Sequence, residues 1–397
     1  MKLSIVTPFP PDISGIGQYG WHMVRGLVQT GRFERILILA PQTAEAGIPI
    51  PEIPGTEVCR PWTQDDLRAP ARLLRCIRAE DPHLVWFNYG FTTFGRSRLS
   101  NMLGMTLPML VQQRGIASVV TLHEIIESVQ LREIGAKNGR LTHLGGALAT
   151  RMLLEADAVC LTIRAYVDRL KARYKVGNLH HLPHGTFDEP DFLPLPNPHR
   201  NILVFGFFAP YKGLPRILAA FELLRRTDPD ITLTVAGGDH ARYPGYLAEV
   251  RDRSGVLPGV TWLGQMSEPE LRTLFARASV VVLPYTATTG ASSVLHRAAT
   301  YGRPVVASDL PDLRAVAKEE NLEVIFVPSH GEEELAQALR QVLADRPRRE
   351  AIGRHNLQAM TGMTYLATSR RYAALFQDVL DRRLKVTGDA SNVKRET

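Results

Sequence analysis

The stretch Asn201-Ile-Leu-Val-Phe-Gly-Phe-Phe-Ala-Pro-Tyr-Lys-Gly-Leu214 decides the fold. Its apolar run, Ile202–Phe205, is typical of a strand that is buried on both faces of a sheet. The run stops in a turn that contains Pro210 and Gly213, and a helical pattern begins directly after it. A buried strand that leads into a helix is the repeating unit of a parallel sheet with crossover helices.

The same unit recurs along the whole chain. Short runs rich in Val, Ile and Leu alternate with longer amphipathic stretches. The predicted strands of the first half are Leu3–Thr7, Ile36–Ala40, Leu84–Asn88, Val119–His123 and Ala158–Thr162. Those of the second half are Ile202–Gly206, Thr232–Ala236, Val260–Leu263, Val280–Leu283, Pro304–Ala307 and Glu323–Val327. We therefore predict an α/β protein with two Rossmann-like sheets.

A proline-rich segment from His184 to Arg200 separates the two halves, because closely spaced prolines exclude a helix and disfavour a strand. The length of 397 residues fits two domains. We predict an N-terminal domain over 1–190 and a C-terminal domain over 191–363. We also predict a helix over 364–384 that packs back on the N-terminal domain, and a disordered tail over 385–397.

Composition narrows the class of protein. Hydrophobic residues make up 45% and charged residues 22%, and no apolar run approaches the ~20 residues that span a bilayer. The N-terminal sequence MKLSIVTPFPP has an apolar stretch that is too short for a secretory signal. The three cysteines lack CxxC spacing, which indicates neither disulfides nor zinc. We expect a cytoplasmic protein, with peripheral contact on the inner face of a membrane as a further possibility.

The net charge of +7 favours an anionic partner. The basic residues are dispersed and lack the motifs of nucleic-acid binding proteins, so we expect no nucleic-acid partner. The remaining candidates for the anionic partner are a phosphorylated ligand and an acidic membrane. In Rossmann-like sheets, ligands bind beyond the carboxyl ends of the strands, at the N-termini of helices. Two such sheets that face each other would form a cleft with one ligand on each side.

The first strand leads into Ser14-Gly-Ile-Gly-Gln18 and then a helix. Gly15 and Gly17 would let the backbone approach an anion or a sugar, although a tight turn without a ligand explains them too. The spacing from Gly15 to Gly20 matches G-x-G-x-x-G, but no acidic residue closes the next strand, Ile36–Ala40, which disfavours NAD.

The second half holds two candidate phosphate contacts. Lys212 follows the strand Ile202–Gly206, where its ammonium would neutralise a diphosphate; a solvated lysine is the alternative. After the strand Val280–Leu283, the hydroxyl residues Thr288, Thr289, Ser292 and Ser293 lie beside Gly290 at the start of a helix. The cluster suits phosphate oxygens, and simple capping of the helix is the alternative.

Other candidates lie at the ends of first-half strands. His123 ends the strand Val119–His123, where it would hydrogen-bond the transferred sugar, unless it is a buried histidine with its partners inside the protein. Glu124 and Tyr89, each just after a predicted strand, are further predicted substrate contacts. Asp228-Pro-Asp230 matches a D-x-D metal motif by letter, but it lies at the opposite sheet end and is interpreted as a solvent turn.

These residues occur in the order typical of the retaining GT-B glycosyltransferases of the large family 4 type. Thr121-Leu-His-Glu124 resembles the "T-L-H-D" segment of that family, and Leu182-Pro-His-Gly185 is similar to "I-P-N-G". Gly206–Gly213 resembles "G-R-L-x-x-x-K-G", which places Lys212 on the donor phosphates. Gly302–Asp309 resembles "G-x-P-V-V-A-S-D". The resemblance implies a GT-B fold and the transfer of a sugar, with retention of configuration, from a nucleotide-diphosphate sugar to a glycan or lipid-linked acceptor in polysaccharide biosynthesis.

The chain departs from that pattern at three positions. Phe207 replaces the arginine beside the lysine, and the two glutamates of "E-G-F-G-x-x-x-x-E-A" fall on Thr289 and Arg297. In the family these glutamates hold a sugar hydroxyl and the nucleotide ribose. Arg297 would instead contact a phosphate or pair with an acidic residue. We expect an active enzyme that needs no metal or other cofactor; a silent sugar-nucleotide-binding subunit and a GT-B sugar-nucleotide epimerase are the alternatives.

The segment Ser100–Val111 is apolar and has Arg96, Arg98 and Arg114 at its flanks. It would lie against an anionic membrane and give access to a lipid-linked acceptor. A buried core helix is the alternative.

Overall fold

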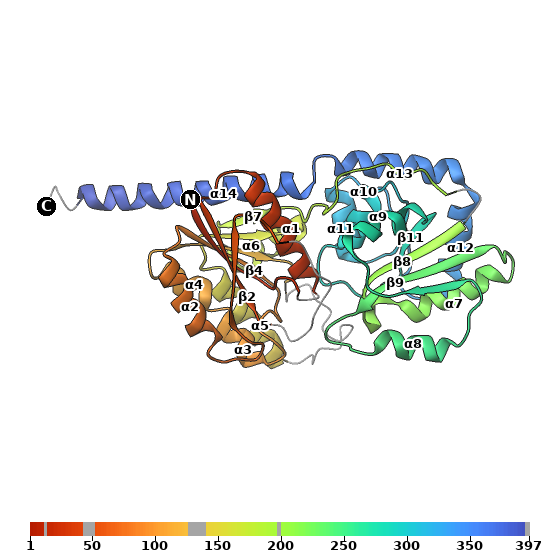
Figure 1. Ribbon diagram of the computed structural model, residues 1–397, viewed down its shortest axis with the longest axis horizontal. Coiled ribbons are helices and arrows are strands. Elements are labelled where there is room, and N and C mark those ends of the chain that lie inside the picture. The colour runs from red at the N-terminus through yellow and green to blue at the C-terminus, as the bar shows by residue number, and fades with distance from the viewer. Residues whose placement is uncertain (12–13, 43–51, 126–139, 197–199, 394–397) are drawn as a thin grey trace. The chain divides into compact units, whose positions relative to one another are not determined.

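The computed structural model describes residues 1–11, 14–42, 52–125, 140–196 and 200–393. The chain divides into two compact units (Figure 1). Of the described residues, the first unit contains those up to 184 and those from 365 to 393, and the second contains those from 185 to 364. The division at His184 lies six residues before the predicted boundary at 190.

The first unit is built on a seven-stranded parallel sheet in the order β3-β2-β1-β4-β5-β6-β7. Its strands are β1 Lys2–Val6, β2 Arg35–Pro41, β3 Thr56–Trp62, β4 Leu84–Tyr89, β5 Ala117–Leu122, β6 Ala158–Leu161 and β7 Leu179–His181. Its helices are α1 Gly15–Gln29, α2 Ala69–Glu80, α3 Arg98–Gly104, α4 Leu107–Gln112, α5 Arg140–Leu153, α6 Arg164–Tyr174 and α14 Tyr365–Val393.

The second unit is built on a six-stranded parallel sheet in the order β10-β9-β8-β11-β12-β13. Its strands are β8 Arg200–Phe208, β9 Ile231–Asp239, β10 Val260–Leu263, β11 Val280–Leu283, β12 Val305–Ser308 and β13 Ile325–Val327. Its helices are α7 Leu214–Arg225, α8 Tyr246–Ser254, α9 Glu268–Ala276, α10 Ser293–Thr300, α11 Pro311–Glu319, α12 Glu332–Ala344 and α13 Arg346–Met360, with the short 3₁₀ turn η1 Pro210–Lys212.

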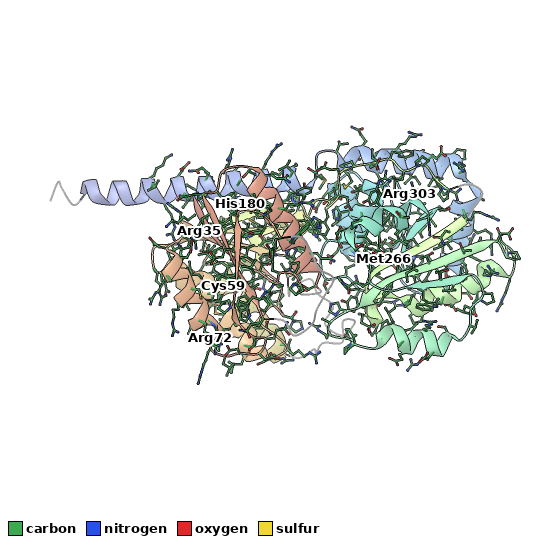
Figure 2. The ribbon with its side chains drawn as sticks, in the orientation of Figure 1. Arg35, Cys59, Arg72, His180, Met266 and Arg303 are labelled. Carbon is green, nitrogen blue, oxygen red and sulfur yellow. The ribbon has the colours of Figure 1, made fainter. Side chains whose placement is uncertain are left out.

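All predicted strands are present, and two were missed, namely β3 and β7. The side chains of β3 are largely half-buried or exposed, so the strand lacks the apolar run of a central strand, and β7 has only three residues. Residues 187–196 of the predicted linker contain neither helix nor strand. Buried Arg303 (Figure 2) anchors this segment, because its guanidinium donates hydrogen bonds to the carbonyls of Leu193 and Pro194.

The C-terminal helix belongs to the first unit. It packs on α1 (Figure 1), and Gly26 permits this close approach because a Cβ there would lie 2.3 Å from Ser369 Oγ. The tail prediction was wrong over 385–393, where α14 continues to Val393; once a helix is nucleated by packing, each added turn costs little. Residues 394–397 lie outside the described part of the chain.

Candidate functional site

The strand order reverses between β8 and β11 in the second sheet, and the loops that follow these two strands meet there. The carbonyl of Tyr211 accepts a hydrogen bond from Thr286 N at 2.9 Å. Gly213 allows this contact, because it has a φ of +67° and a Cβ there would lie 1.8 Å from Pro284 O. The structure therefore brings the predicted lysine loop beside the predicted hydroxyl-rich loop.

Lys212 lies between aromatic rings in this corner. Its Nζ is 3.9 Å from the ring centroid of Tyr285 and 5.5 Å from that of Tyr211, distances at which a cation interacts with a ring. Burial lowers the pKa of Lys212, partly opposed by Tyr211. Within the described residues no carboxylate pairs with its Nζ. Lys212 is thus a half-buried cation, fixed by its contact with the ring of Tyr285, that is available to an anionic ligand. The sequence analysis did not predict this role of Tyr285.

The loop after β11 ends in a run of backbone donors. Gly290 has a φ of +124°, and Ser292 caps α10 by accepting a hydrogen bond from Leu295 N. In the described part of the chain, the backbone N–H groups of residues 290–294 have no hydrogen-bond partner. Unpaired N–H groups at a helix N-terminus attract anions, and the side chains of Thr289 and Ser293 are half-buried beside them.

A buried ion pair between His296 and Glu320 stabilises the N-terminal turn of α10. His296 Nδ1 donates to Ser292 O at 2.8 Å, and His296 Nε2 lies 2.7 Å from Glu320 Oε2. Both side chains are almost fully buried. Although burial opposes it, the charge and hydrogen bond of Glu320 raise the pKa of His296. A protonated His296 therefore ties the capping residue Ser292 to the core of the second unit.

Arg297 is engaged with acidic side chains. Its Nη2 donates to both oxygens of Glu268, at 2.9 and 2.8 Å, and its Nη1 lies 3.5 Å from Asp188 Oδ2. The side chain is 3% exposed, and these carboxylates raise its pKa despite its burial. Of the two outcomes expected for Arg297, the structure contains the ion pair. We accordingly leave Arg297 out of the proposed phosphate contacts.

In the first unit, His123 lies where β5 ends, and its hydrogen bonds fix its tautomer. Asn88 Nδ2 donates to Thr7 Oγ1 and to the carbonyl of Ile16, at 2.9 and 3.2 Å. Asn88 Oδ1 must therefore accept from His123 Nε2, which is 2.7 Å away. Burial lowers the pKa of His123 to about 4, so the ring is neutral and its Nδ1 is left as an acceptor.

The T-shaped contact between His123 and Tyr19, with ring centroids 4.6 Å apart, holds the imidazole from the side. Tyr19 OH is in turn 3.1 Å from Tyr372 OH on α14. The supporting residue Asn88 was not predicted; a buried amide at the end of the apolar strand β4 is the signal that could have found it.

The structure places Gly15 and Gly17 at the N-terminus of a helix, where the sequence predicts them. Gly15 and Gly17 lie in the first turn of α1, and Gly17 N donates to the capping residue Ser14 at 3.0 Å. No space constraint acts on Gly15. Gly20 does have one, because a Cβ there would lie 2.8 Å from Thr7 Oγ1, so its role is the packing of α1 against the end of β1.

The two remaining predicted contacts differ in exposure. Glu124 is half-buried and its Oε1 accepts from Phe91 N at 3.0 Å. Tyr89 is fully buried, with its ring beside those of Phe87 and Phe94, and has no exposed face for a substrate. We therefore assign Tyr89 to the core. Burial alone accounts for this, since β4 is buried along its whole length.

The predicted membrane segment is mostly core. Met105, Leu107 and Val111 are buried, as expected of the alternative, a core helix. Leu99, just before that segment, is 55% exposed. In the described part of the chain, no helix has both the length and the apolarity required to span a bilayer.

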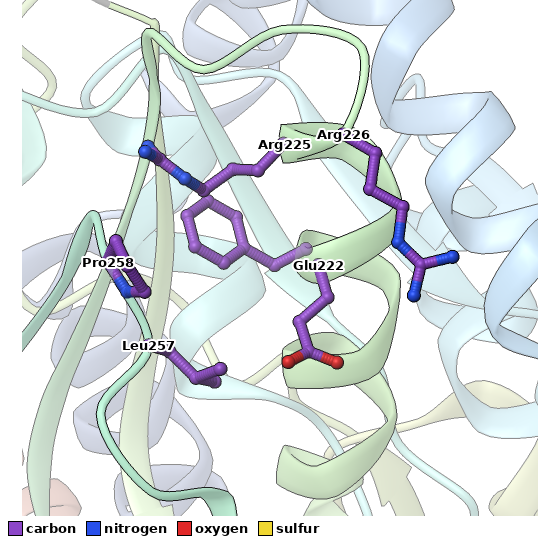
Figure 3. A pocket seen from close by; sticks show the side chains of 6 residues that line it. Glu222, Arg225, Arg226, Leu257 and Pro258 are labelled. Carbon is purple, nitrogen blue, oxygen red and sulfur yellow. The ribbon is translucent and has the colours of Figure 1, made fainter.

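Neither of the two pockets described lies at these loops. One, of about 300 Å³, lies between the C-terminal end of α7, with Glu222, Arg225 and the capping residue Arg226, and the loop residues Leu257 and Pro258 (Figure 3). Arg225 Nη1 there donates to Ile231 O at 2.8 Å, at the start of β9. This pocket is at the amino ends of the strands, opposite to the loops that carry Lys212 and Gly290. The other lies in the first unit, between Met1 and the α14 residues Leu380 and Leu384.

Comparison with known families agrees with this architecture. The family described as "Glycosyl transferase 4-like domain" matches residues 14–184, and that described as "Glycosyl transferases group 1" matches residues 199–345. The chain belongs to these glycosyltransferases. The predicted family and the GT-B fold are thereby confirmed.

Individual relatives of this glycosyltransferase chain match part of its length. It is 28% identical to D-inositol 3-phosphate glycosyltransferase of Stackebrandtia nassauensis over 46% of this chain and 43% of that protein. It is 30% identical to phosphatidyl-myo-inositol mannosyltransferase of Mycolicibacterium smegmatis over 40% of each. The alignments thus span about two fifths of these curated relatives.

Solved structures extend the likeness of the glycosyltransferase chain to its whole fold. Sucrose-phosphate synthase of Thermosynechococcus elongatus has a TM-score of 0.75 at 18% identity and covers 96% of this chain and all of that one. Anabaena HepE in complex with UDP-glucose has a TM-score of 0.65 at 16% identity and covers 95% of this chain and all of that one.

Proposed function

We propose that this glycosyltransferase moves a sugar, with retention of anomeric configuration, from a nucleotide-diphosphate sugar to a glycan or lipid-linked acceptor. The observation that carries the proposal is the corner formed by Lys212, held over Tyr285, and the unpaired N–H groups from Gly290 to Val294. A diphosphate is the ligand whose charge matches this corner. The structure of HepE with UDP-glucose supports a nucleotide sugar as the ligand class.

The corner would act mainly on the leaving group. As the bond between the sugar and the diphosphate breaks, negative charge develops on the diphosphate oxygens. Lys212 and the N-terminus of α10 are fixed by protein contacts, so they would stabilise that charge without reorganising. A phosphate oxygen of the leaving group would take the proton of the acceptor hydroxyl as the new bond forms. This step requires no separate protein base.

His123 would orient a sugar hydroxyl. Its neutral ring has Nε2–H committed to Asn88, so Nδ1 would accept a hydrogen bond from the hydroxyl rather than donate one. In the same proposal the acceptor belongs to polysaccharide biosynthesis, and the protein is cytoplasmic with peripheral contact to a membrane.

A silent nucleotide-sugar-binding subunit is the second candidate. The observation in its favour is that the two positions of the family glutamates hold Thr289 and a buried Arg297 paired with Glu268. The corner around Lys212 would then bind a nucleotide sugar without transferring the sugar.

Incubation with UDP-, GDP- and ADP-sugars, with and without a lipid or glycan acceptor fraction, tests the proposal. Release of a nucleoside diphosphate together with a glycosylated product that keeps the anomeric configuration supports it. Binding without release supports the silent subunit, and conversion of the sugar into its epimer supports an epimerase; either result contradicts the proposal.

A further inference from the structure

Three of the exposed leucines of the first unit lie on the helices α3 and α5. Leu99 on α3 is 55% exposed, and Leu144 and Leu148 on α5 are 67% and 54% exposed. Leu144 and Leu148 are four residues apart, so they project from the same face of α5. Exposed leucines that recur on one helix face need a reason, because each leaves apolar surface in water.

The two helices form one patch. A Cβ on Gly145 of α5 would lie 3.7 Å from Cε of Met102 on α3, so the helices are in contact at this point. Met102 is three residues after Leu99, hence on the same side of α3. Figure 1 shows α3 and α5 at the same end of the first unit. We call Leu99, Met102, Leu144 and Leu148 the leucine patch.

The helices of the leucine patch carry basic but no acidic side chains. Neither residues 96–123 nor residues 138–154 contain an aspartate or a glutamate. Arg98 precedes Leu99 on α3, Arg151 lies one turn after Leu148 on α5, and both are exposed, as are Arg96 and Arg114. One carboxylate lies nearby, that of Asp65, whose Oδ1 accepts a hydrogen bond from Ser97 N.

We propose that the leucine patch is a docking surface for an anionic lipid bilayer, in which the leucines enter the headgroup region and the arginines contact lipid phosphates. Apolar side chains surrounded by arginines match a bilayer surface in both chemistry and charge. A second copy of this chain fits less well, because joining two such faces would bring their arginines together. The proposal extends the membrane contact of the proposed function and does not depend on donor chemistry.

Sedimentation with vesicles tests the docking surface. The full chain should sediment with vesicles of phosphatidylcholine and phosphatidylglycerol but much less with phosphatidylcholine alone. Leu144→Ser with Leu148→Ser should weaken the partition by about tenfold or more, because two apolar side chains no longer enter the bilayer. Arg98→Glu with Arg151→Glu should weaken it by at least about tenfold at low salt.

Matched controls come from the second unit. Val256→Ser removes a 97% exposed apolar side chain, and Arg251→Glu reverses an exposed charge; neither should change sedimentation. Equal binding by the leucine variant and Val256→Ser, or equal binding to both vesicle types, overturns the proposal. So does a wild-type dimer in analytical ultracentrifugation that the leucine variant abolishes, since a second copy would then cover the patch.

The proposed function is assessed separately in the same samples. Titration with UDP, GDP and ADP should give equal affinities for the leucine variant and the wild type, since no residue of the leucine patch belongs to the second unit. Loss of sedimentation with unchanged nucleotide affinity supports the docking surface. A wild type that binds vesicles but no nucleotide contradicts the proposed function alone.

Discussion

Arg297 holds the carboxylate of Glu268 through two hydrogen bonds, 2.9 and 2.8 Å long, at the position where the resemblance to the family motif predicts a glutamate. The charge expected at that position is therefore reversed, but the carboxylate of Glu268, at the start of α9, lies beside it. Glu268 remains 30% exposed while Arg297 is 3% exposed. The arginine thus acts inside the second unit, on its own acidic partners.

Replacing Arg297 by Met should destabilise the second unit. Two acidic side chains, Glu268 and Asp188, would lose their shared cation, at a cost of about 1–3 kcal/mol because both are partly exposed to water. Urea unfolding measures this, with Arg251→Met as the exposed control. Unchanged stability together with a large loss of nucleotide affinity would instead show that Arg297 contacts the ligand.

Replacing Gly213 by Ala should weaken nucleotide binding. The φ of +67° and the 1.8 Å approach of a Cβ to Pro284 O would force the lysine loop away from the loop of Tyr285. We expect a loss of nucleoside diphosphate affinity of at least about tenfold, the equivalent of one hydrogen bond to a charged group. Gly362→Ala is the control, since a Cβ there meets nothing within 4 Å. Equal affinity in the Gly213 variant would mean that the two loops need not touch.

The pair of His296 and Glu320 should make stability depend on pH. The folded-state pKa of His296 is raised, so the pair contributes fully below the unfolded value of about 6.5 and this contribution is lost as the pH rises through the folded pKa. Between the unfolded and the folded pKa of His296, the free energy of unfolding should fall by up to about 1.4 kcal/mol per pH unit. Glu320→Gln should remove this slope in urea unfolding measured from pH 6 to 9. A slope that is the same in both proteins would show that His296 is neutral in the fold.

His123 should have the opposite pH behaviour. Its pKa is lowered to about 4, so its contribution to stability is present above about 6.5 and is lost as the pH falls toward 4. Imidazole ¹⁵N shifts should show a neutral ring protonated at Nε2 at pH 7, with no titration near 6.5. Asn88→Leu should mix the two tautomers. Titration near 6.5 in the wild type would contradict a buried His123.

The strands and the two-sheet fold could be predicted because a parallel sheet needs apolar runs such as Ile202–Phe205, which local sequence shows directly. The positions of Lys212 and Gly290 could be predicted for a related reason, since each lies on the loop that follows the carboxyl end of such a run. The sequence pattern did not reveal β3, whose exposed side chains lack that periodicity.

The partners of the candidate site residues required the structure. Tyr285 supports Lys212 from 73 positions away, and Glu268 reaches Arg297 from another helix; contacts of this kind follow from tertiary packing and leave no local pattern. Tyr89 was predicted as a substrate contact just after a strand, but neither that position nor the residue type distinguishes a half-buried site residue from a fully buried one. For the same reason, the exposure of Leu144 and Leu148 could not be predicted from the sequence.

The most direct test of the central claim is calorimetric titration of UDP, GDP and ADP into wild type and Lys212→Met, which keeps an unbranched side chain one atom shorter but removes its charge. If Lys212 holds the diphosphate, the nucleotide that binds the wild type should bind the variant about ten- to a hundredfold more weakly, with unchanged unfolding. Equal affinity in the two proteins would contradict a diphosphate site at Lys212 and α10.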